Sequence, residues 1–210
     1  MQITHLGHAC VLLEAGDQRV LFDPGNFSTD WHGLTGLSAV VATHQHPDHF
    51  DREHAPVLFA ANPDARVLLE PELCAAAGTG EPLHAGDVVA LGDLELVAVG
   101  GRHAIIHADI PGVGNVGVVV RGQGQPTFFH PGDSLAETPQ GIDVVAVPAY
   151  GPWAAMKETI DFVRAVDAPH GFLIHDGLLG ERGWALAFGR LGEMSHTSFD
   201  DLRDGRPRTY

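Results

Sequence analysis

The sequence predicts an α/β protein in which two mixed sheets pack face to face and helices cover their outer surfaces. Short strands come first, strand and helix then alternate, short strands return, and the last third alternates again. A helix predicted over about 153–166 has Met156, Ile160 and Val163 on one face and Lys157 off it, as expected for a helix packed on a sheet. This order indicates four layers, α/β/β/α, made of two similar halves.

The first half opens as a β-meander and then changes to alternating strands and helices. A hairpin turn over 15–18 and the break at Asp23-Pro24 delimit the meander, and a Gly-rich surface loop follows over 27–38. The helix at 71–77 is marked by Pro71 in its first turn and by Gly78 at its end. The expected strands are 2–6, 9–14, 19–23, 39–43 and 66–70, and the expected helices are 52–61 and 71–77.

The second half repeats this plan. Gly and Asp turns separate a further series of short strands, and the last third places one helix after each of its two strands. The expected strands are 82–84, 87–91, 94–99, 115–121, 127–130, 143–147 and 171–174, and the expected helices are 153–166 and 181–189.

Length and charge limit the class of protein. A chain of 210 residues fits a single domain over 1–210, and the formal charge of −15 argues against a broad nucleic-acid surface and against binding to anionic membranes. Two cysteines, Cys10 and Cys74, are too few for a disulfide framework, which fits a reducing, cytoplasmic location. No secretory signal and no apolar run long enough for a membrane span is evident, so a soluble protein is expected.

The densest group of chemically informative residues follows the apolar run Ala39–Ala42. His44, His46, Asp48 and His49 lie within six positions, where a buried strand opens into a loop. Imidazole and carboxylate suit zinc, iron, manganese or cobalt, and a His-x-His pair can direct two rings at one ion. Asp48 and His49 would then face a second ion. The alternative is a polar loop that caps a helix, but four ligand-type residues in one turn favour metal.

These residues carry a family resemblance. Thr43-His44-Gln45-His46-Pro47-Asp48-His49 matches the pattern T-H-x-H-x-D-H, and the sequence resembles the metallo-β-lactamase-fold hydrolase superfamily over nearly its whole length. The opening Thr4-His5-Leu6-Gly7-His8-Ala9-Cys10, with Leu21-Phe22-Asp23-Pro24, is similar to the branch that contains ascorbate-phosphate lactonase-like and uncharacterised hydrolases. The resemblance implies the four-layer αββα fold and metal-dependent hydrolysis.

The resemblance also implies four further site positions. Asp23 would support the metal ligands without binding metal, His103 would be a ligand after a strand, Asp133 would bridge two ions, and His175 would be a ligand at the end of the last strand. His107 competes with His103, because the two would share a face if the segment were helical, and His170 lies at the other end of the strand before His175. His130, before Pro131, is expected to be structural.

The implied site holds two divalent cations, most simply Zn²⁺, with Mn²⁺ or Fe²⁺ as alternatives. The first ion would have His44, His46 and His103, the second would have Asp48, His49 and His175, and Asp133 would join them. The expected mechanism is hydrolysis by a metal-bound hydroxide, which the two cations make available near neutral pH. Asp48 is a candidate to orient the hydroxide, and His8, His107 or metal-bound water could protonate the leaving group.

The substrate is expected to be a small ester-type molecule, namely a lactone, a phosphodiester or a thioester. Tyr150, Trp153 and Trp31 are candidates to line its pocket, under the loops 27–38, 104–115 and 148–155. Three other functions stay open: a mononuclear iron dioxygenase acting on a thiol, an RNA-processing nuclease, and a metal-stabilised binding module without turnover. A homo-oligomer is compatible with the sequence but is not required by it.

Overall fold

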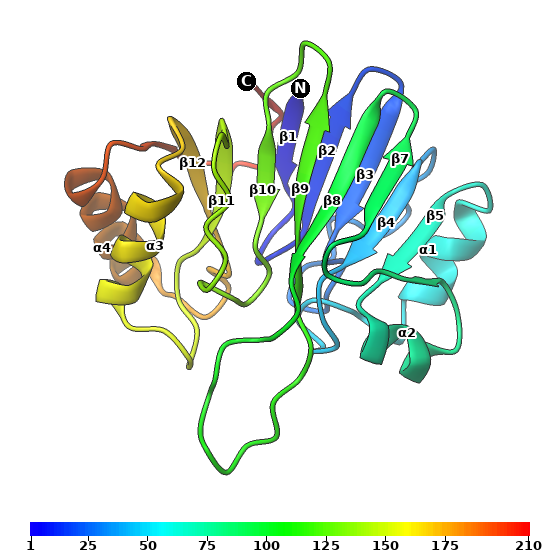
Figure 1. Ribbon diagram of the computed structural model, residues 1–210, viewed down its shortest axis with the longest axis horizontal. Coiled ribbons are helices and arrows are strands. Elements are labelled where there is room, and N and C mark those ends of the chain that lie inside the picture. The colour runs from blue at the N-terminus through cyan, green and yellow to red at the C-terminus, as the bar shows by residue number, and fades with distance from the viewer.

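The computed structural model describes residues 1–210 as two seven-stranded sheets packed face to face (Figure 1). The first sheet has the order β14-β1-β2-β3-β4-β5-β6. Its strands are β1 (Gln2–His5), β2 (Val11–Ala15), β3 (Gln18–Phe22), β4 (Ala39–Ala42), β5 (Arg66–Leu69), β6 (Glu81–Pro82) and β14 (Arg208–Thr209).

The second sheet has the order β13-β12-β11-β10-β9-β8-β7 and completes the predicted pair of mixed sheets. Neighbouring strands from β7 to β10 pair antiparallel, whereas neighbouring strands from β10 to β13 pair parallel. Its strands are β7 (Val88–Leu91), β8 (Leu94–Gly100), β9 (Val116–Gly122), β10 (Phe128–His130), β11 (Val144–Pro148), β12 (His170–Ile174) and β13 (Ser198–Asp200).

Four helices cover the outer faces of the sheets. Helices α1 (Ala55–Ala61) and α2 (Pro71–Ala77) flank the first sheet, and α3 (Met156–Val166) and α4 (Glu181–Met194) flank the second (Figure 1). The buried side of α3 consists of Thr159, Phe162, Val163 and Val166, which follow the helical repeat. None of the helices has the length and apolar character that crossing a bilayer requires.

The main core lies between the sheets, where 23 buried apolar residues form one cluster. Phe22 of the first sheet meets Phe128 of the second edge to face, with ring centroids 5.8 Å apart, and Phe128 stacks on Phe172. Residues on the opposite strand faces pack against the helices. Because both faces of these strands are buried, the sequence of β4 and β11 is apolar without alternation.

Strand direction brings the predicted site residues to one edge of the molecule. In the first sheet, β1, β3 and β4 run the same way and lead into His8, Asp23 and the segment 43–49, respectively. In the second sheet, β8, β10 and β12 share a direction and lead into His103, Asp133 and His175. Ligands commonly bind at the carboxyl ends of strands in α/β folds.

The structure differs from the predicted elements in a few places. Helix α1 begins at Ala55 instead of residue 52, because the Asp51 carboxylate accepts the backbone N–H groups of Glu53 and His54 and holds a turn there. Helix α4 runs to Met194, beyond the predicted end at 189. The short strands β13 and β14 were not predicted. They are defined by pairing with β12 and β1, to which no local pattern points.

Candidate metal centre

The seven predicted metal ligands lie together, in two adjacent groups. His44, His46, His103 and Asp133 form the first group, and in each group the ligand-type atoms lie within 4.8 Å of one another. Asp48, His49 and His175 belong to the second group, which His8 completes. Each group therefore combines residues from both sheets.

The Asp133 carboxylate lies between the two groups. Its Oδ1 is 3.1 Å from His49 Nε2, and its Oδ2 is 3.3 Å from His103 Nε2 and 3.1 Å from His175 Nε2. His44 Nε2 is 3.9 Å from the same Oδ2. This arrangement places one carboxylate within reach of ligands from both groups, as the bridging position of a two-metal site requires.

Asp23 fixes the orientation of two of the imidazoles. It is fully buried, and its carboxylate accepts the Thr43 backbone N–H at 2.7 Å, the Thr43 hydroxyl at 2.8 Å and His49 Nδ1–H at 2.7 Å. Because the Thr43 hydroxyl donates to Asp23, its oxygen accepts Nδ1–H of His44 at 3.0 Å. In its neutral form, each ring therefore directs the lone pair of Nε2 at the centre. Asp23 therefore lies behind two of the predicted ligands, and its predicted supporting role stays a prediction.

Backbone carbonyls orient two further rings in the same way. His103 donates Nδ1–H to the Ala104 carbonyl at 2.6 Å, and His175 donates Nδ1–H to the Tyr150 carbonyl. The Nε2 atoms of His49, His103 and His175 and Oδ1 of Asp133 are buried without a hydrogen-bond partner. Buried polar atoms are otherwise almost always paired. Three such nitrogens around the Asp133 carboxylate, each on a ring held by a hydrogen bond at Nδ1, fit a divalent metal centre.

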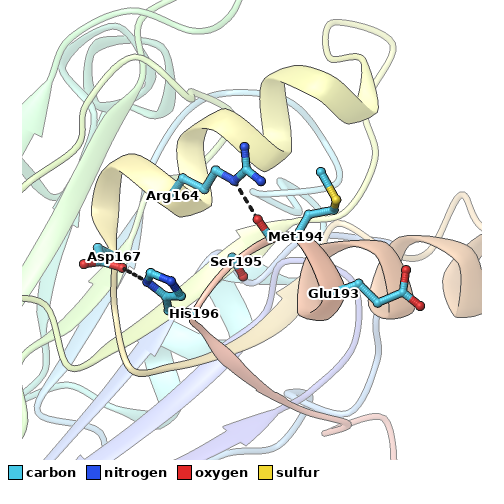
Figure 2. A pocket seen from close by; sticks show the side chains of 6 residues that line it. All are labelled: Arg164, Asp167, Glu193, Met194, Ser195 and His196. Atoms are coloured by element: carbon cyan, nitrogen blue, oxygen red, sulfur yellow. Dashed lines mark hydrogen bonds and ion pairs between the residues drawn. The ribbon is translucent and has the colours of Figure 1, made fainter.

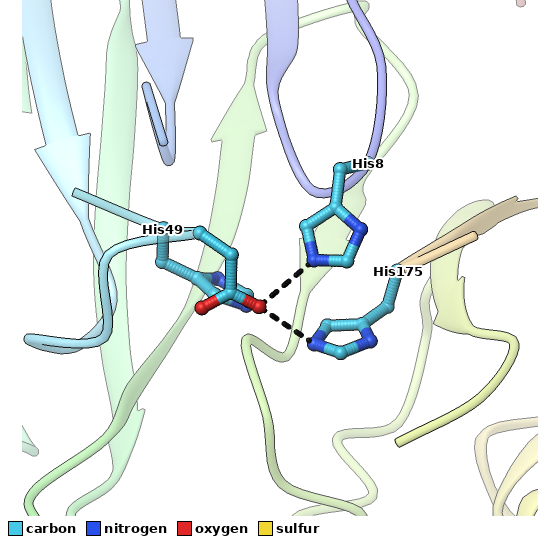
Figure 3. A group of neighbouring side chains, drawn as sticks. His8, His49 and His175 are labelled. Carbon is cyan, nitrogen blue, oxygen red and sulfur yellow. Dashed lines mark hydrogen bonds and ion pairs between the residues drawn. The ribbon is translucent and has the colours of Figure 1, made fainter. Parts of the chain in front are cut away.

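His8 has the opposite tautomer. Its Nδ1 accepts the backbone N–H of Gly177 at 3.1 Å, so in the neutral ring Nε2 carries the proton and donates to Asp48 Oδ2 at 3.0 Å. Figure 3 shows His8 and His175 joined by dashed lines to one carboxylate oxygen, with His49 beside it. His175 Nε2 is 3.4 Å from the same Asp48 oxygen. His8 thus serves as a hydrogen-bond donor to Asp48 in this arrangement, and its predicted role in proton transfer stays a prediction.

The charges of the metal-free centre are strongly coupled. Burial lowers the pKa of His44 well below its ordinary value, and repulsion from His49 adds to this effect. Burial also acts to lower the pKa of His49, but Asp133 and Asp23 outweigh it and raise that pKa well above the usual range. In the same way, burial is outweighed at His175, where the nearby carboxylates of Asp133 and Asp48 raise the pKa to about 9. Positive ions are therefore favoured here, whether protons or metals.

Backbone strain accompanies the site. Four non-glycine residues have a positive φ, and three of them are His8 at 54°, Asp23 at 46° and His175 at 57°. This left-handed conformation is costly for residues with a Cβ and occurs preferentially at functional sites. Gly25 shows a related constraint, because a Cβ there would lie 1.8 Å from the Asp48 carbonyl oxygen. The loop 24–26 is thus packed directly against the ligand loop.

Trp153 is a neighbour of the centre that the sequence suggested only as a pocket residue. Its indole N–H donates to Asp133 Oδ2 at 3.1 Å, and its ring lies about midway between those of His103 and His175, with centroids 5.9 and 6.0 Å away. Gly151 makes this position available, since a Cβ there would lie 2.4 Å from the indole. No local sequence signal marks the contact between Trp153 and Asp133.

Other predicted residues lie elsewhere. Trp31 is buried in the core and donates its indole N–H to the Gly25 carbonyl, so the prediction that it lines the pocket was wrong. The segment around His107 is not helical, and His107 is exposed and joins neither group. It does line a hollow together with His46 and His103. His130 is buried next to Asp23 and bonded to the Ala9 carbonyl, outside both groups.

Two hollows adjoin the centre at His103. One, of about 620 Å³, lies between the loops 102–105 and 134–138, Trp153 and α3, and the other, of about 310 Å³, lies under the long loop that projects between β8 and β9 in Figure 1. A third hollow, at the C-terminal ends of α3 and α4, is shown in Figure 2. Polar groups in this hollow form hydrogen bonds with one another; for example, Arg164 donates to the Met194 carbonyl. The hollow lies at the opposite end of the strands from the metal centre.

Comparisons with known proteins agree with this geometry. The family model described as "Beta-lactamase superfamily domain" matches residues 2–170, so the chain belongs to the β-lactamase superfamily. Among curated relatives, Protein Rv0786c of Mycobacterium tuberculosis is 41% identical over 214 residues, covering 100% of both chains. A "UPF0173 metal-dependent hydrolase" of Methylobacterium nodulans is 28% identical over 153 residues, which span 64% of this chain and 63% of the relative.

Solved structures share the fold at low sequence identity. Igni18, a metallo hydrolase from Ignicoccus hospitalis, has a TM-score of 0.73 at 14% identity, covering 100% of this chain and 97% of that one. CmlA, a diiron β-hydroxylase from Streptomyces venezuelae, has a TM-score of 0.69 at 17% identity, covering 100% of this chain and 53% of its own. The predicted metallo-β-lactamase fold is thus confirmed, and the fold alone does not select hydrolysis over oxygen chemistry.

Proposed function

We propose that this protein is a metal-dependent hydrolase that holds two divalent cations, in the simplest case Zn²⁺, and cleaves a small ester-type substrate. The observation that carries the proposal is the convergence of unpaired Nε2 atoms from His49, His103 and His175 on the Asp133 carboxylate. His44, His46, His103 and Asp133 would hold one cation, and Asp48, His49, His175 and Asp133 the other. Divalent cations in such a site lower the pKa of coordinated water and polarise the substrate oxygen.

The protein's own groups orient the site and distribute its protons. Asp23 and Thr43 keep the Nδ1 atoms of His49 and His44 protonated, and the carbonyls of Ala104 and Tyr150 do the same for His103 and His175. His8 donates to Asp48, and Trp153 donates to Asp133. Each of these donors holds a carboxylate at its Oδ2, and Oδ1 of Asp133 stays without a hydrogen-bond partner. Preorganised dipoles of this kind are the main contribution of protein to such catalysis.

No protein nucleophile is needed. Ser134 follows Asp133 and is buried, but its only hydrogen bond is from the Ala136 N–H, and no histidine lies within bonding distance to activate it. We also propose His107 and His8 as candidate proton donors to the leaving group. The site opens toward the two hollows beside His103, whose sizes suit a small molecule.

The proposal is tested by metal analysis of protein purified without added metal, followed by assays with a lactone, a phosphodiester and a thioester. We expect about two divalent ions per chain and hydrolysis of at least one substrate class, and His44→Ala should lose one of the ions and the hydrolysis. One iron per chain with thiol-dependent oxygen uptake would instead identify a dioxygenase. RNA cleavage would identify a nuclease. Full metal content without turnover of any substrate would leave a metal-stabilised binding module and overturn the proposed hydrolase.

A further inference from the structure

The metal centre is surrounded by exposed apolar side chains. Nine large hydrophobic residues of the protein are exposed, and five of them lie on loops at this centre. Proteins usually expose large apolar side chains singly, so the clustering of five of them around one site indicates a binding surface. The five are Phe27, Ile105, Ile110, Tyr150 and Leu178.

These residues contact or adjoin the site on both sides. Phe27 packs against the His8 ring with centroids 4.8 Å apart, and Tyr150 supplies the carbonyl that holds His175. Leu178 follows Gly177, the residue that donates to His8. On the other side, Ile105 lines both hollows beside His103. The apolar surface therefore extends across both halves of the centre.

The larger hollow continues this surface inward as a groove. Its walls are formed mainly by apolar residues, and His103 and Trp153 connect it to the metal centre. A volume of about 620 Å³ is within the range of small-molecule sites, about 300–1,000 Å³. The apolar residues that line it are Ala104, Ile105, Leu135, Ala136, Trp153, Phe162 and Ala165.

The charges of the groove disfavour an anionic ligand. Arg102 is the only lysine or arginine among the residues that line the two hollows, and Glu158 and Asp161 lie in the same groove. Recognition of phosphate or carboxylate normally uses several convergent arginine or lysine donors. The chain as a whole carries a formal charge of −15, so a negatively charged substrate would also meet a repulsive field.

From these observations we infer that the substrate is an uncharged acyl compound whose apolar chain or ring lies in the groove lined by Leu135, Phe162 and Ala165. This inference rests on the proposed function and narrows its substrate class. Neutral esters, lactones or thioesters with a hydrophobic acyl group are substrates, and phosphodiesters and sugar phosphates are not. The bond that is cleaved lies near Asp133, and the acyl group extends away past Trp153.

The test compares matched substrates on the metal-loaded protein: p-nitrophenyl acetate, p-nitrophenyl hexanoate and the mono-p-nitrophenyl ester of adipic acid, which ends in a carboxylate. Burial of a methylene group is worth up to about fourfold in kcat/KM. We expect hexanoate to exceed acetate by at least about tenfold, and adipate to lose most of that gain. Equal rates for acetate and hexanoate, or adipate as good as hexanoate, would overturn the inference.

Ala165→Glu places a charge in the groove at an exposed position, and Ala60→Glu is its matched control. Both alanines are exposed and each is the next-to-last residue of a helix, α3 and α1 respectively. We expect Ala165→Glu to abolish the preference for hexanoate over acetate, and Ala60→Glu to leave that preference unchanged. An equal loss in the two variants would contradict the inference.

Binding provides a readout that does not depend on turnover. Octanamide, an uncharged compound, should quench tryptophan fluorescence saturably through Trp153, acetamide should not, and Ala165→Glu should weaken octanamide binding at least about tenfold. If no ester is hydrolysed but octanamide binds in this way, the proposed hydrolase fails and the apolar site stands. If short esters are hydrolysed and octanamide does not bind, the hydrolase stands and this inference fails. A dimer that Ala165→Glu dissociates would assign the groove to a subunit interface and also overturn it.

Discussion

Replacing Asp23 by Asn should weaken metal binding without touching a metal ligand. The carboxylate accepts three hydrogen bonds, two from Thr43 and one from His49. An Asn side chain keeps one acceptor oxygen for the Thr43 N–H, but its amide group can accept neither the Thr43 hydroxyl nor Nδ1–H of His49. The His49 proton is then free to move to Nε2, which blocks the atom that faces the centre. Loss of a supporting residue of this kind typically lowers metal affinity about 10–100-fold.

The cost in stability can be estimated from the same contacts. A buried donor left without an acceptor costs about 1–3 kcal/mol, and Asp23→Asn leaves two of them, so it should destabilise the fold by about 2–6 kcal/mol. Asp23→Ala would leave all three donors without an acceptor, at a cost of about 3–9 kcal/mol. That cost approaches the whole free energy of unfolding of a typical domain, about 5–15 kcal/mol. The Asn variant is therefore the informative one.

The measurement is zinc competition with a chromophoric chelator, together with the thermal midpoint. Long-range ¹H–¹⁵N NMR of the histidine rings would report the tautomer of His49 directly. Asp17→Asn, at the exposed turn between β2 and β3, removes the same charge away from the site and serves as control. If Asp23→Asn keeps the affinity and thermal midpoint of Asp17→Asn, Asp23 does not set the ligand tautomer.

Three further outcomes are expected. Asp133→Ala should lose both ions while His103→Ala loses mainly one, because only Asp133 reaches both groups; equal stoichiometry by mass spectrometry under non-denaturing conditions would contradict this. Gly25→Ala should lower the thermal midpoint by several degrees and weaken metal binding, since its Cβ would collide with the Asp48 carbonyl; an unchanged melting curve would refute the clash. In metal-free protein the raised pKa of His175, about 9, contributes stability that is full below about pH 6.5 and is lost as the pH rises to about 9. Zinc binding must displace that proton as well as the one held by His49, so calorimetry in two buffers should detect proton release at pH 7.5 that is smaller by about one proton per chain in His175→Gln.

The ligand loop could be predicted from sequence because its chemistry is local. His44, His46, Asp48 and His49 follow one apolar strand, and no other element is needed to interpret them. His103, Asp133 and His175 each follow a strand far away in the chain, and only the family resemblance connected them to the loop. The structure brings all seven together, which is the geometry that the resemblance implied.

The missed features depend on contacts that no local pattern contains. The tautomer of His8 is set by the N–H of Gly177, 169 positions later in the chain. Trp31 looks like a surface aromatic in a Gly-rich loop, yet that loop folds back and buries it against the core. The positive φ of His8, Asp23 and His175 could not be anticipated either, because none of them is a glycine and the surrounding packing imposes the conformation.

The division of each ligand group between the two sheets has a mechanical consequence. An ion held by His44 and Asp133, or by His49 and His175, fastens one half of the chain to the other across the core. Metal would then act like a removable cross-link, which restricts the unfolded chain by closing long loops between the halves. Chelation should therefore weaken the packing between the two sheets before either sheet unfolds. The two halves of the chain, made as separate polypeptides, should reassociate more tightly when the cation is present.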